Sequence, residues 1–332
     1  METTLGNFWE ILFMNSLKKQ LSLPILLIAF NRPKTLERQF QNLDRLSSRK
    51  IVVHIDGATN STRESQKSVL LLAEKWAYES NHDVDIKAKN FNLGLRNHFP
   101  AAACDFFSSH TAGIILEDDI DFGQTFIDLC EKTFNLVSFG HLWSICGHNP
   151  SGKLLEQNRV EIDLRLSRIH TIWGWATSSS NIERFLSYAT KPREEMFKDI
   201  EVFSKEITRD IFLQRAISLT WRRKIARYLL PNSGGSWDNI WELAGWNSKL
   251  PSLIPSHSLS TEFAFANESG MHASKRAPHK FYSEASIHSV SKISKQKNRC
   301  DLAMMRMWGI SREYSWAYAL RIASQLRKSE DL

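Results

Sequence analysis

Three carboxylates in a row, Glu117, Asp118 and Asp119, end an apolar run that begins at Gly113, and Asp121 follows two residues later. Neighbouring carboxylates repel one another and raise their own pKa values unless a cation lies among them. Oxygen ligands of this kind suit Mn²⁺ or Mg²⁺. The spacing therefore predicts a divalent-metal site, and the alternative is a solvated acidic turn after a strand.

A further carboxylate, Asp238, directly follows Trp237 in the sequence Gly-Gly-Ser-Trp-Asp. A carboxylate beside indole rings loses solvation, which favours its protonated form and suits a proton acceptor that works near neutral pH. Aspartate is also a good N-cap, and a helix is expected over residues 239–246. Asp238 is thus a candidate base, a candidate helix cap, or both.

The elements that must position these residues alternate between strand and helix from Pro24 onward. The expected strands cover 24–30, 51–55, 84–89, 113–116 and 142–146, and the expected helices cover 35–46, 61–78, 95–107 and 126–137. This alternation predicts an α/β fold with a doubly wound, mostly parallel sheet whose strands are covered by helices on both faces. Ligands bind at the carboxyl ends of such strands, where the acidic run stands.

The later half of the chain is rich in tryptophan, serine, glycine and arginine. Seven of the eleven tryptophans fall between positions 140 and 250: Trp143, Trp173, Trp175, Trp221, Trp237, Trp241 and Trp246. Aromatic density of this kind is by default core packing. The alternative is the stacking wall of a carbohydrate or nucleobase pocket.

The chain has 332 residues and a formal net charge of +7. Basic residues concentrate in three later segments, 222–224, 275–276 and 292–299. No helix-turn-helix, zinc finger or RNP-type motif accompanies this charge, so we expect no nucleic acid partner. Peripheral contact with an anionic membrane, or binding of phosphate-bearing substrates, accounts for the charge instead.

The four cysteines are widely spaced and form no CxxC pair, which indicates reduced, structural thiols. No stretch reaches the ~18 apolar residues of a membrane-spanning helix. The first ten residues carry acids where a signal peptide would carry Lys or Arg. We expect a cytoplasmic protein, and the amphipathic pattern of residues 1–22 allows a peripheral position on the cytoplasmic face of the inner membrane.

Phosphate-binding signatures are missing from the first half of the chain. No GxxxxGK[ST] motif is present, and Asn31-Arg32-Pro33 follows the first expected strand in place of a GxGxxG turn. P-loop NTPases and standard dinucleotide dehydrogenases are therefore excluded. Sugar-1-phosphate nucleotidyltransferases are disfavoured for the same lack of glycines.

Six segments resemble, in order and spacing, the GT-A nucleotide-sugar glycosyltransferases. Within that fold the chain is most similar to bacterial cell-surface glycan transferases related to the eukaryotic α-mannoside β-1,2-N-acetylglucosaminyltransferases. The segments cover 24–33, 51–57, 92–95, 113–119, 170–177 and 236–241, and the resemblance spans roughly residues 23 to 272. Two departures are the added carboxylate at Asp121 and the sequence Gly-Leu-Arg-Asn-His over 94–98.

By this resemblance Arg32 and Asp56 are uridine contacts. Arg32 offers a fork of donors, and Asp56 accepts from the base or the ribose. The alternative is a surface Arg–Asp pair of little energetic weight.

Four positions around the second and third strands complete the expected nucleotide side. Gly57 and Gly94 are expected to allow a close approach or a special backbone conformation. Arg96 and His98 either reach the nucleotide or lie on a helix surface.

The acidic run takes the place of the family's metal motif. The resemblance implies that Asp119 ligates the divalent ion that bridges the diphosphate, that Asp118 lies near the ribose, and that Glu117 belongs to the same donor site. His272 resembles a late histidine that approaches the metal, or it is a surface histidine in a loop.

Asp238 matches the family's catalytic base, which removes the proton of the acceptor hydroxyl during inverting transfer. Gly174 and Trp175 would line the donor-sugar or acceptor pocket. The chain then divides into an N-terminal helix (1–22), a nucleotide-sugar-binding half (23–150), an acceptor and catalytic half of the same GT-A domain (151–272) and a basic helical tail (273–332).

The resemblance implies a metal-dependent, inverting hexosyl- or N-acetylhexosaminyltransferase. Its donor would be a nucleotide sugar, with UDP as the nucleotide, and its acceptor a hydroxyl of a cell-surface polysaccharide or a lipid-linked oligosaccharide. The alternative is a non-catalytic scaffold that holds a nucleotide sugar or a glycan in a polysaccharide assembly complex. Loss of the metal carboxylates or of the base would mark such a scaffold, and both are present.

Overall fold

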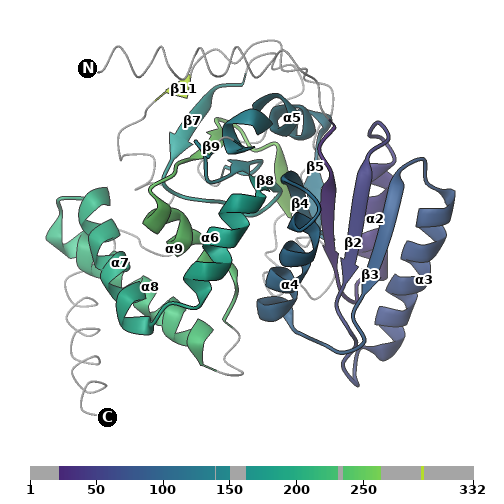
Figure 1. Ribbon diagram of the computed structural model, residues 1–332, viewed down its shortest axis with the longest axis horizontal. Coiled ribbons are helices and arrows are strands. Elements are labelled where there is room, and N and C mark those ends of the chain that lie inside the picture. Colours follow the sequence, from purple (N-terminus) through teal and green to yellow (C-terminus); the bar gives the residue numbers. More distant parts are fainter. Residues whose placement is uncertain (1–21, 139, 150–161, 231–234, 263–292, 295–332) are drawn as a thin grey trace.

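The computed structural model describes residues 22–138, 140–149, 162–230, 235–262 and 293–294 (Figure 1). The helix expected within 1–22 lies outside these ranges. So do His272 and nearly all of the basic tail. Of the tail, only the two residues of strand β11 (Ile293–Ser294) are described.

The described strands form a nine-stranded sheet in the order β11-β7-β9-β6-β8-β4-β1-β2-β3. Five of its eight strand pairings are parallel, so the mostly parallel sheet is confirmed. Its parallel half consists of β1 (Ile25–Ala29), β2 (Lys50–Ile55), β3 (Asp83–Ala88) and β4 (Ala112–Glu117). Its mixed half consists of β6 (Ile145–Cys146), β7 (Leu164–Ser167), β8 (Trp175–Ser178) and β9 (Ser252–Pro255), with β11 at the edge.

A second, two-stranded sheet pairs β5 (Ile120–Phe122) with β10 (Ser260–Glu262). Strand β5 begins three residues after β4 ends, so the polar residues between the two strands lie in a tight turn. The antiparallel pairing with β10 draws a distant segment of the chain against this turn.

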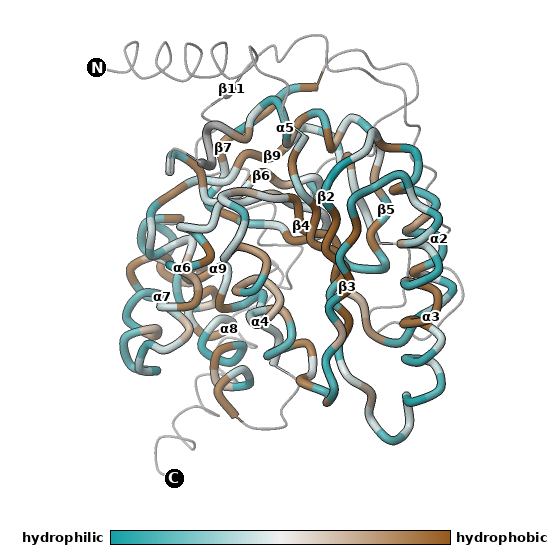
Figure 2. The backbone as a smooth tube through the Cα atoms, turned by 45° about the vertical axis from the view of Figure 1, so that its right-hand side comes forward, coloured by the Kyte–Doolittle hydropathy of each residue, from teal (hydrophilic) through white to brown (hydrophobic). Residues whose placement is uncertain are grey.

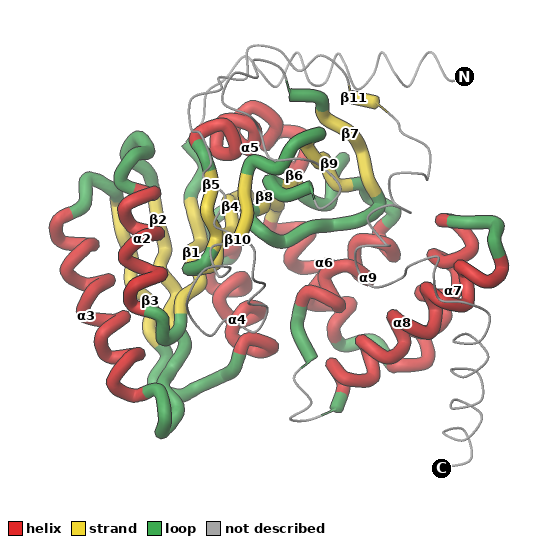
Figure 3. Tube along the Cα trace, turned by 180° about the vertical axis from the view of Figure 1, so that it is seen from behind, coloured by secondary structure: helices red, strands yellow, loops and turns green. Residues whose placement is uncertain are grey.

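Helices cover both faces of the main sheet, as the doubly wound prediction requires (Figures 1 and 3). The helices are α2 (Pro33–Leu43), α3 (Arg63–Glu79), α4 (Leu95–Phe107), α5 (Gln124–Ser138), α6 (Ser179–Ala189), α7 (Arg193–Ile207), α8 (Ile211–Leu229) and α9 (Asp238–Ser248). Alternate residues of β1 divide between the two cores: Ile25 and Leu27 pack with α2, α3 and α5, whereas Leu26 and Ile28 pack with α4 and the later helices. This division follows from the period of two along a strand.

The prediction of strands buried on both faces holds for β1, β2 and β4 but is wrong for β3. Strand β3 lies at the edge of the sheet. Three of its residues, Asp83, Asp85 and Lys87, are charged and exposed. Lys50 of β2 bridges the first two of these through ion pairs of 3.1 and 2.8 Å. Charged side chains on an edge strand hinder pairing with another chain.

The aromatic half is core packing. Six of the seven tryptophans between 140 and 250 are buried with 3% exposure or less, and Trp173 is partly buried. Their rings stack on one another and on phenylalanines; the Phe99 and Trp237 ring centroids are 3.6 Å apart, and those of Trp175 and Trp241 are 4.4 Å apart. The sequence allowed a second role for these tryptophans, as the stacking wall of a ligand pocket. Burial excludes that role for the six enclosed rings.

Candidate functional site

The candidate site lies where the parallel strands β1 and β4 end side by side. Ile28 and Glu117 are register partners, and the Asp118 N–H donates to the Ile28 carbonyl at 2.9 Å. Helix α2 begins at Pro33, whose ring suits the first helical position, so the chain turns sharply at Arg32. The ends of both strands therefore deliver a guanidinium group and three carboxylates to one edge of the sheet.

Arg32 donates hydrogen bonds to two carboxylates of the acidic run. Its Nη1 donates to Asp119 Oδ2 at 2.7 Å, and its Nη2 donates to Asp118 Oδ1. The two carboxylates are nearly buried, whereas the Arg32 side chain is about one third exposed. The fork geometry makes Arg32 the counter-ion of the acidic run, a position that sequence reasoning did not foresee, since it placed Arg32 on the uridine.

Arg32 does not balance the negative charge of this cluster. Burial raises the pKa of Asp118 to about 7 in spite of Arg32, with the charge of Asp119 acting in the same direction. Burial also raises the pKa of Glu117 well above its usual value, and the charges of Asp119, Asp118 and Asp238 add to the effect. Asp118 Oδ2 is buried and finds no hydrogen-bond donor among the described residues. An orphaned carboxylate oxygen in an undercompensated cluster fits a further cation.

Within the described ranges, no three His, Cys, Asp or Glu side chains are arranged to hold a metal ion by themselves. A Mg²⁺-type ion commonly uses one or two carboxylates and takes its other ligands from water and substrate phosphates. Asp119 and Asp118 each give only one oxygen to Arg32, so each retains one for such an ion. The residues present therefore fit a metal that binds together with a diphosphate.

Asp238 is brought to the same cluster by the start of α9. It is half-buried, and its Oδ1 accepts the N–H of Asn239 at 2.8 Å. Its charge contributes to the raised pKa values of Glu117 and of Glu242, which places it within electrostatic range of the acidic run. Trp237, buried on Phe99, anchors this helix start. The start of α9 therefore lies within electrostatic range of the acidic run at the end of β4.

Asp56 organises a loop, and its acceptors are fully used. Its Oδ1 accepts the N–H groups of Gly57 and Leu93, both at 2.9 Å, and its Oδ2 accepts the Gly94 N–H at 2.9 Å and the Asn92 amide at 3.1 Å. A carboxylate offers about four lone-pair sites. A base or ribose could bind Asp56 only by displacing one of these donors.

The expectations for Gly57 and Gly94 are confirmed. A Cβ on Gly57 would lie 2.2 Å from the Phe91 carbonyl carbon, so the loops after β2 and β3 touch only because no side chain intervenes. Gly94 has φ +69°, in the left-handed region that glycine adopts without strain. The sequence signal for both was the glycine itself at a strand end.

Arg96 and His98 contact other parts of the protein, and no hydrogen bond or ion pair of the described residues links them to the acidic run. The Arg96 guanidinium lies 4.4 Å from the Tyr228 ring centroid and donates to the Leu230 carbonyl at 3.3 Å, so it ties α4 to the end of α8. His98 is 2% exposed and shares a hydrogen bond of 2.8 Å with His54 of β2. His98 falls on the sheet-facing side of α4, and neither of its two expected positions, nucleotide or helix surface, describes it.

Gly174 and Trp175 also depart from expectation. Gly174 has φ +74°, and a Cβ there would meet the Ser260 side chain at 3.0 Å, so it serves the contact with β10. Trp175 is 1% exposed within β8 and packs on Trp241. A ring enclosed in this way lines the core and cannot line a donor-sugar or acceptor pocket.

Asp121 has a structural role that the sequence left unassigned. Its two oxygens accept from Arg38 at 3.1 Å and from Asn42 at 3.2 Å, so it ties β5 to α2. Arg38 and Asn42 are four residues apart on α2, and their i, i+4 spacing was the only available signal. The fourth carboxylate thus has partners on α2 instead of Arg32.

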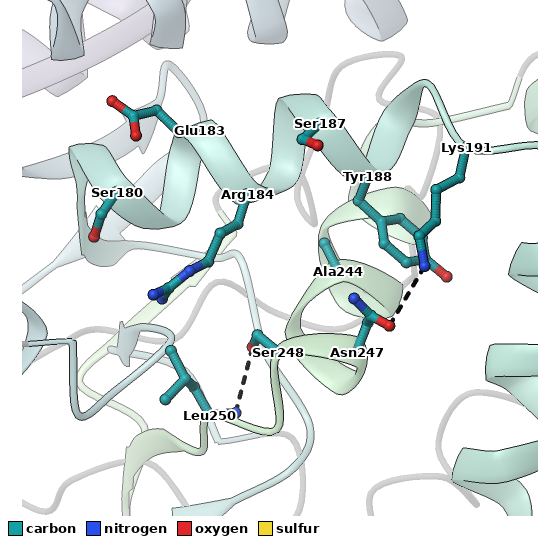
Figure 4. Close-up of a pocket in the computed structure, with 10 residues that line it drawn as sticks. All are labelled: Ser180, Glu183, Arg184, Ser187, Tyr188, Lys191, Ala244, Asn247, Ser248 and Leu250. Atoms are coloured by element: carbon teal, nitrogen blue, oxygen red, sulfur yellow. Dashed lines mark hydrogen bonds between the residues drawn. The ribbon is translucent and has the colours of Figure 1, made fainter.

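A separate hollow of about 620 Å³ lies between α6 and α9 and contains none of the predicted site residues (Figure 4). Its lining includes Arg184, Tyr188 and Lys191 from or just after α6, and Asn247 from α9. Lys191 contacts the Asn247 amide oxygen at 3.5 Å. Four of its ten lining residues are exposed and four more are half-buried, so the hollow is an open surface groove rather than an enclosed site.

No protein-family model matches the chain, and no curated protein matches it. Among solved structures it is similar to the mannosyltransferase PcManGT from Pyrobaculum calidifontis, which was solved in complex with GDP-Man and Mn²⁺. The sequence identity is 10%, the match covers 74% of this chain and 77% of that one, and the TM-score is 0.36. A likeness of that size carries no conclusion about function here. Among the described residues no helix is both long and apolar enough to span a bilayer.

Proposed function

We propose that this chain is a metal-dependent glycosyltransferase of the GT-A type that transfers a sugar from a nucleotide donor with inversion. The observation that carries the proposal is the pairing of Arg32 with Asp118 and Asp119 at the carboxyl ends of β1 and β4, with Asp238 within electrostatic range of Glu117. Ligands bind at this edge in open α/β sheets. The resemblance of the six sequence segments supports the same reading.

In this proposal Asp119 and Asp118 hold a divalent ion through the oxygens that Arg32 leaves unused. The bound ion would supply Lewis-acid stabilisation of the departing nucleoside diphosphate. Arg32 adds a second positive charge beside the diphosphate, and its fork of donors matches phosphate oxygens. Asp56 acts indirectly, because it fixes the backbone of residues 92–94 beside the nucleotide.

Asp238 accepts the proton of the acceptor hydroxyl as that oxygen attacks the anomeric carbon. At the half-buried start of α9, its Oδ1 accepts the Asn239 N–H, and its Oδ2 is the oxygen that would meet a hydroxyl. The donor nucleotide is UDP in this proposal. The acceptor is a hydroxyl of a cell-surface polysaccharide or a lipid-linked oligosaccharide on the cytoplasmic side of the membrane.

The first experiment is a thermal-shift and calorimetric screen of UDP, GDP, CMP and their sugar conjugates with and without Mn²⁺. A ligand that binds only the native state raises its stability by mass action. We expect UDP to stabilise the wild type only with Mn²⁺, and Asp119→Asn to lose that response. Glu74→Gln, which removes an exposed carboxylate on α3, is the control and should respond as the wild type does.

A binding scaffold without catalysis is the second candidate, and one observation favours it. Arg32 already takes one oxygen of Asp118 and one of Asp119, so part of the acidic run is unavailable to a catalytic metal ion. The variant Asp238→Asn separates the two. A transferase binds the donor in both proteins but consumes it only with Asp238 intact, whereas a scaffold binds the donor and consumes it in neither.

A further inference from the structure

Helix α8 (Ile211–Leu229) carries five basic residues and no acidic one: Arg215, Arg222, Arg223, Lys224 and Arg227. The nearest carboxylate in sequence is Asp210, which caps the helix and accepts the N–H groups of Phe212 and Leu213 at 3.0 and 3.2 Å. The positive charge of α8 is therefore not balanced along the helix itself.

One side of α8 is packed and the opposite side faces outward. The packed side shows Ile217, Trp221, Ile225 and Tyr228, which lie against α7 and α9. At 100° per residue, the opposite side includes Ala226 and six larger side chains, and we call these six the α8 outer face. The α8 outer face comprises Phe212, Arg215, Leu219, Arg223, Arg227 and Leu230.

The α8 outer face mixes exposed apolar side chains with exposed arginines. Phe212 is 48% exposed near one end and Leu230 is 58% exposed just past the other. The three arginines between them are exposed, and Leu219 in the middle is half-buried. Figures 1 and 3 show α7 and α8 as the outermost helices, on the side of the molecule away from α3.

Acidic side chains of the neighbouring α7 do not neutralise this face. Glu201 pairs with Arg222, which lies beside the face rather than on it, and Glu206 pairs with Arg168 at 3.3 Å. Among the ion pairs of the described residues, neither Arg215 nor Arg223 has a carboxylate partner. Their charge is therefore directed outward.

We propose that the α8 outer face docks on an anionic lipid surface, with α8 lying in the plane of the interface. A surface that binds a dissolved polyanion needs only positive charge. This face also exposes large apolar side chains, one on each side of its arginines. Phenylalanine and leucine enter the boundary between headgroups and acyl chains, while arginines extend to the phosphates. Helix α8 is too polar to cross a bilayer, so it would lie on the membrane surface.

This docking has a consequence for the proposed site. The Leu230 carbonyl accepts from Arg96 at the start of α4, directly after the loop that Asp56 holds. A surface in contact with Leu230 is thereby close to the nucleotide side of the proposed site. If the proposed function holds, a lipid-linked acceptor fits this arrangement better than a free polysaccharide.

The test is flotation of the full chain with vesicles of phosphatidylcholine alone and of equal parts phosphatidylcholine and phosphatidylglycerol. We expect binding only to the anionic vesicles. Each basic residue near such a surface contributes about 1 kcal/mol, so Arg215→Gln/Arg223→Gln should weaken partitioning about thirtyfold. Phe212→Ser/Leu230→Ser should weaken it about tenfold through lost apolar burial.

Matched variants on α3 are the controls, because α3 is exposed on the far side. Arg63→Gln/Lys67→Gln removes the same charge, and Leu71→Ser/Tyr78→Ser removes exposed apolar groups. Both controls should bind anionic vesicles as the wild type does. Thermal unfolding of every variant verifies the fold.

Four outcomes would overturn the proposal. The wild type fails to bind anionic vesicles, the α8 variants bind as well as the wild type, or the α3 controls lose as much binding as the α8 variants. Loss with the arginine pair but none with the apolar pair would also overturn it, in favour of a soluble polyanion. The nucleotide response is measured separately in each variant, so failure of the transferase proposal leaves the vesicle result intact.

Discussion

At the scale of single residues, the site depends on which cation lies among the carboxylates. Arg32 is held by two of them, and a buried oxygen of Asp118 remains without a donor. The Arg32 guanidinium balances one of the three negative charges. A divalent ion, bound together with a diphosphate, would balance the other two. Arg32 is therefore both a structural counter-ion and a candidate phosphate contact.

Arg32→Gln should lower the free energy of unfolding by about 2 kcal/mol without metal, because two nearly buried carboxylates lose their partner. Mn²⁺ should restore more stability to this variant than it adds to the wild type. Chemical denaturation with and without Mn²⁺ measures both effects. Arg38→Gln, which breaks a pair with Asp121 outside the cluster, is the control and should gain nothing extra from Mn²⁺. Equal responses to the ion in all three proteins would contradict the role of Arg32.

At the scale of elements, β2 and α4 are joined by a pair of histidines. His54 Nδ1 and His98 Nε2 are 2.8 Å apart, and burial lowers the pKa of each ring to about 4, with the charge of His98 or Lys89 acting in the same direction. One ring donates and the other accepts, and the lowered pKa values keep both rings neutral in the folded protein near neutral pH. Protonation of the accepting nitrogen would break this link between the sheet and the helix that follows the Gly94 loop.

The fold should therefore lose stability as the pH falls from about 6.5 to 4, the range between the unfolded and folded pKa values of these rings. The sign follows because the unfolded chain binds the protons first. Each ring contributes at most about 3 kcal/mol to this loss. His98→Gln should show a shallower loss than the wild type in urea unfolding across this range, whereas His110→Gln, a half-buried position three residues after α4 ends, should not. Parallel pH profiles for all three proteins would refute the assignment.

A second element-scale contact sets the position of α9, which carries Asp238. Gly245 lies inside this helix, and a Cβ there would stand 2.3 Å from His170 Nε2 and 2.9 Å from Trp143 Cδ1. The His170 ring cannot move easily. Its Nδ1 shares a hydrogen bond of 2.5 Å with the Ser252 hydroxyl, and the backbone N–H of His170 donates to Glu242 at 3.0 Å. Close packing against the His170 ring therefore leaves room only for glycine at position 245.

Gly245→Ala should destabilise the protein by about 2 kcal/mol or more, although alanine gains about 1 kcal/mol in helix propensity. The steric clash outweighs the propensity because it involves an enclosed imidazole. Urea denaturation compares this variant with Asn247→Ala, an exposed change on the same helix that should be neutral within about 0.5 kcal/mol. A stabilised Gly245→Ala protein would show that α9 has room to shift.

At the scale of the whole molecule, the two halves expected from the sequence share one sheet and one site. Strand β8 of the late half pairs with β4 of the early half, and β4 carries the acidic run. The core on the α4 side includes residues from both halves, among them Leu26 and Ile115 with Trp175 and Trp241. Asp238 reaches the cluster only through this shared core.

A chain that ends at residue 150 should consequently fail to fold cooperatively. Its sheet would expose β4 as an unpaired edge and leave the α4 side of the core open. Calorimetry should show one transition for the full chain, and amide NMR dispersion should be lost in the truncated one. A folded fragment that still bound UDP and Mn²⁺ would show that the early half is an independent domain.

The sequence alone determined the α/β class, the parallel half of the sheet and the place of the acidic run, because apolar runs and strand ends depend on local periodicity. It also indicated the special backbone at Gly57 and Gly94. Only the tertiary structure decided what each polar group contacts: Arg32 with the carboxylates, Asp56 with a loop backbone, His98 with His54, and Trp175 within the core. These outcomes depend on which side chains from distant segments compete for the same donors and the same buried space, and that competition is settled only when the sheet and its helices pack together.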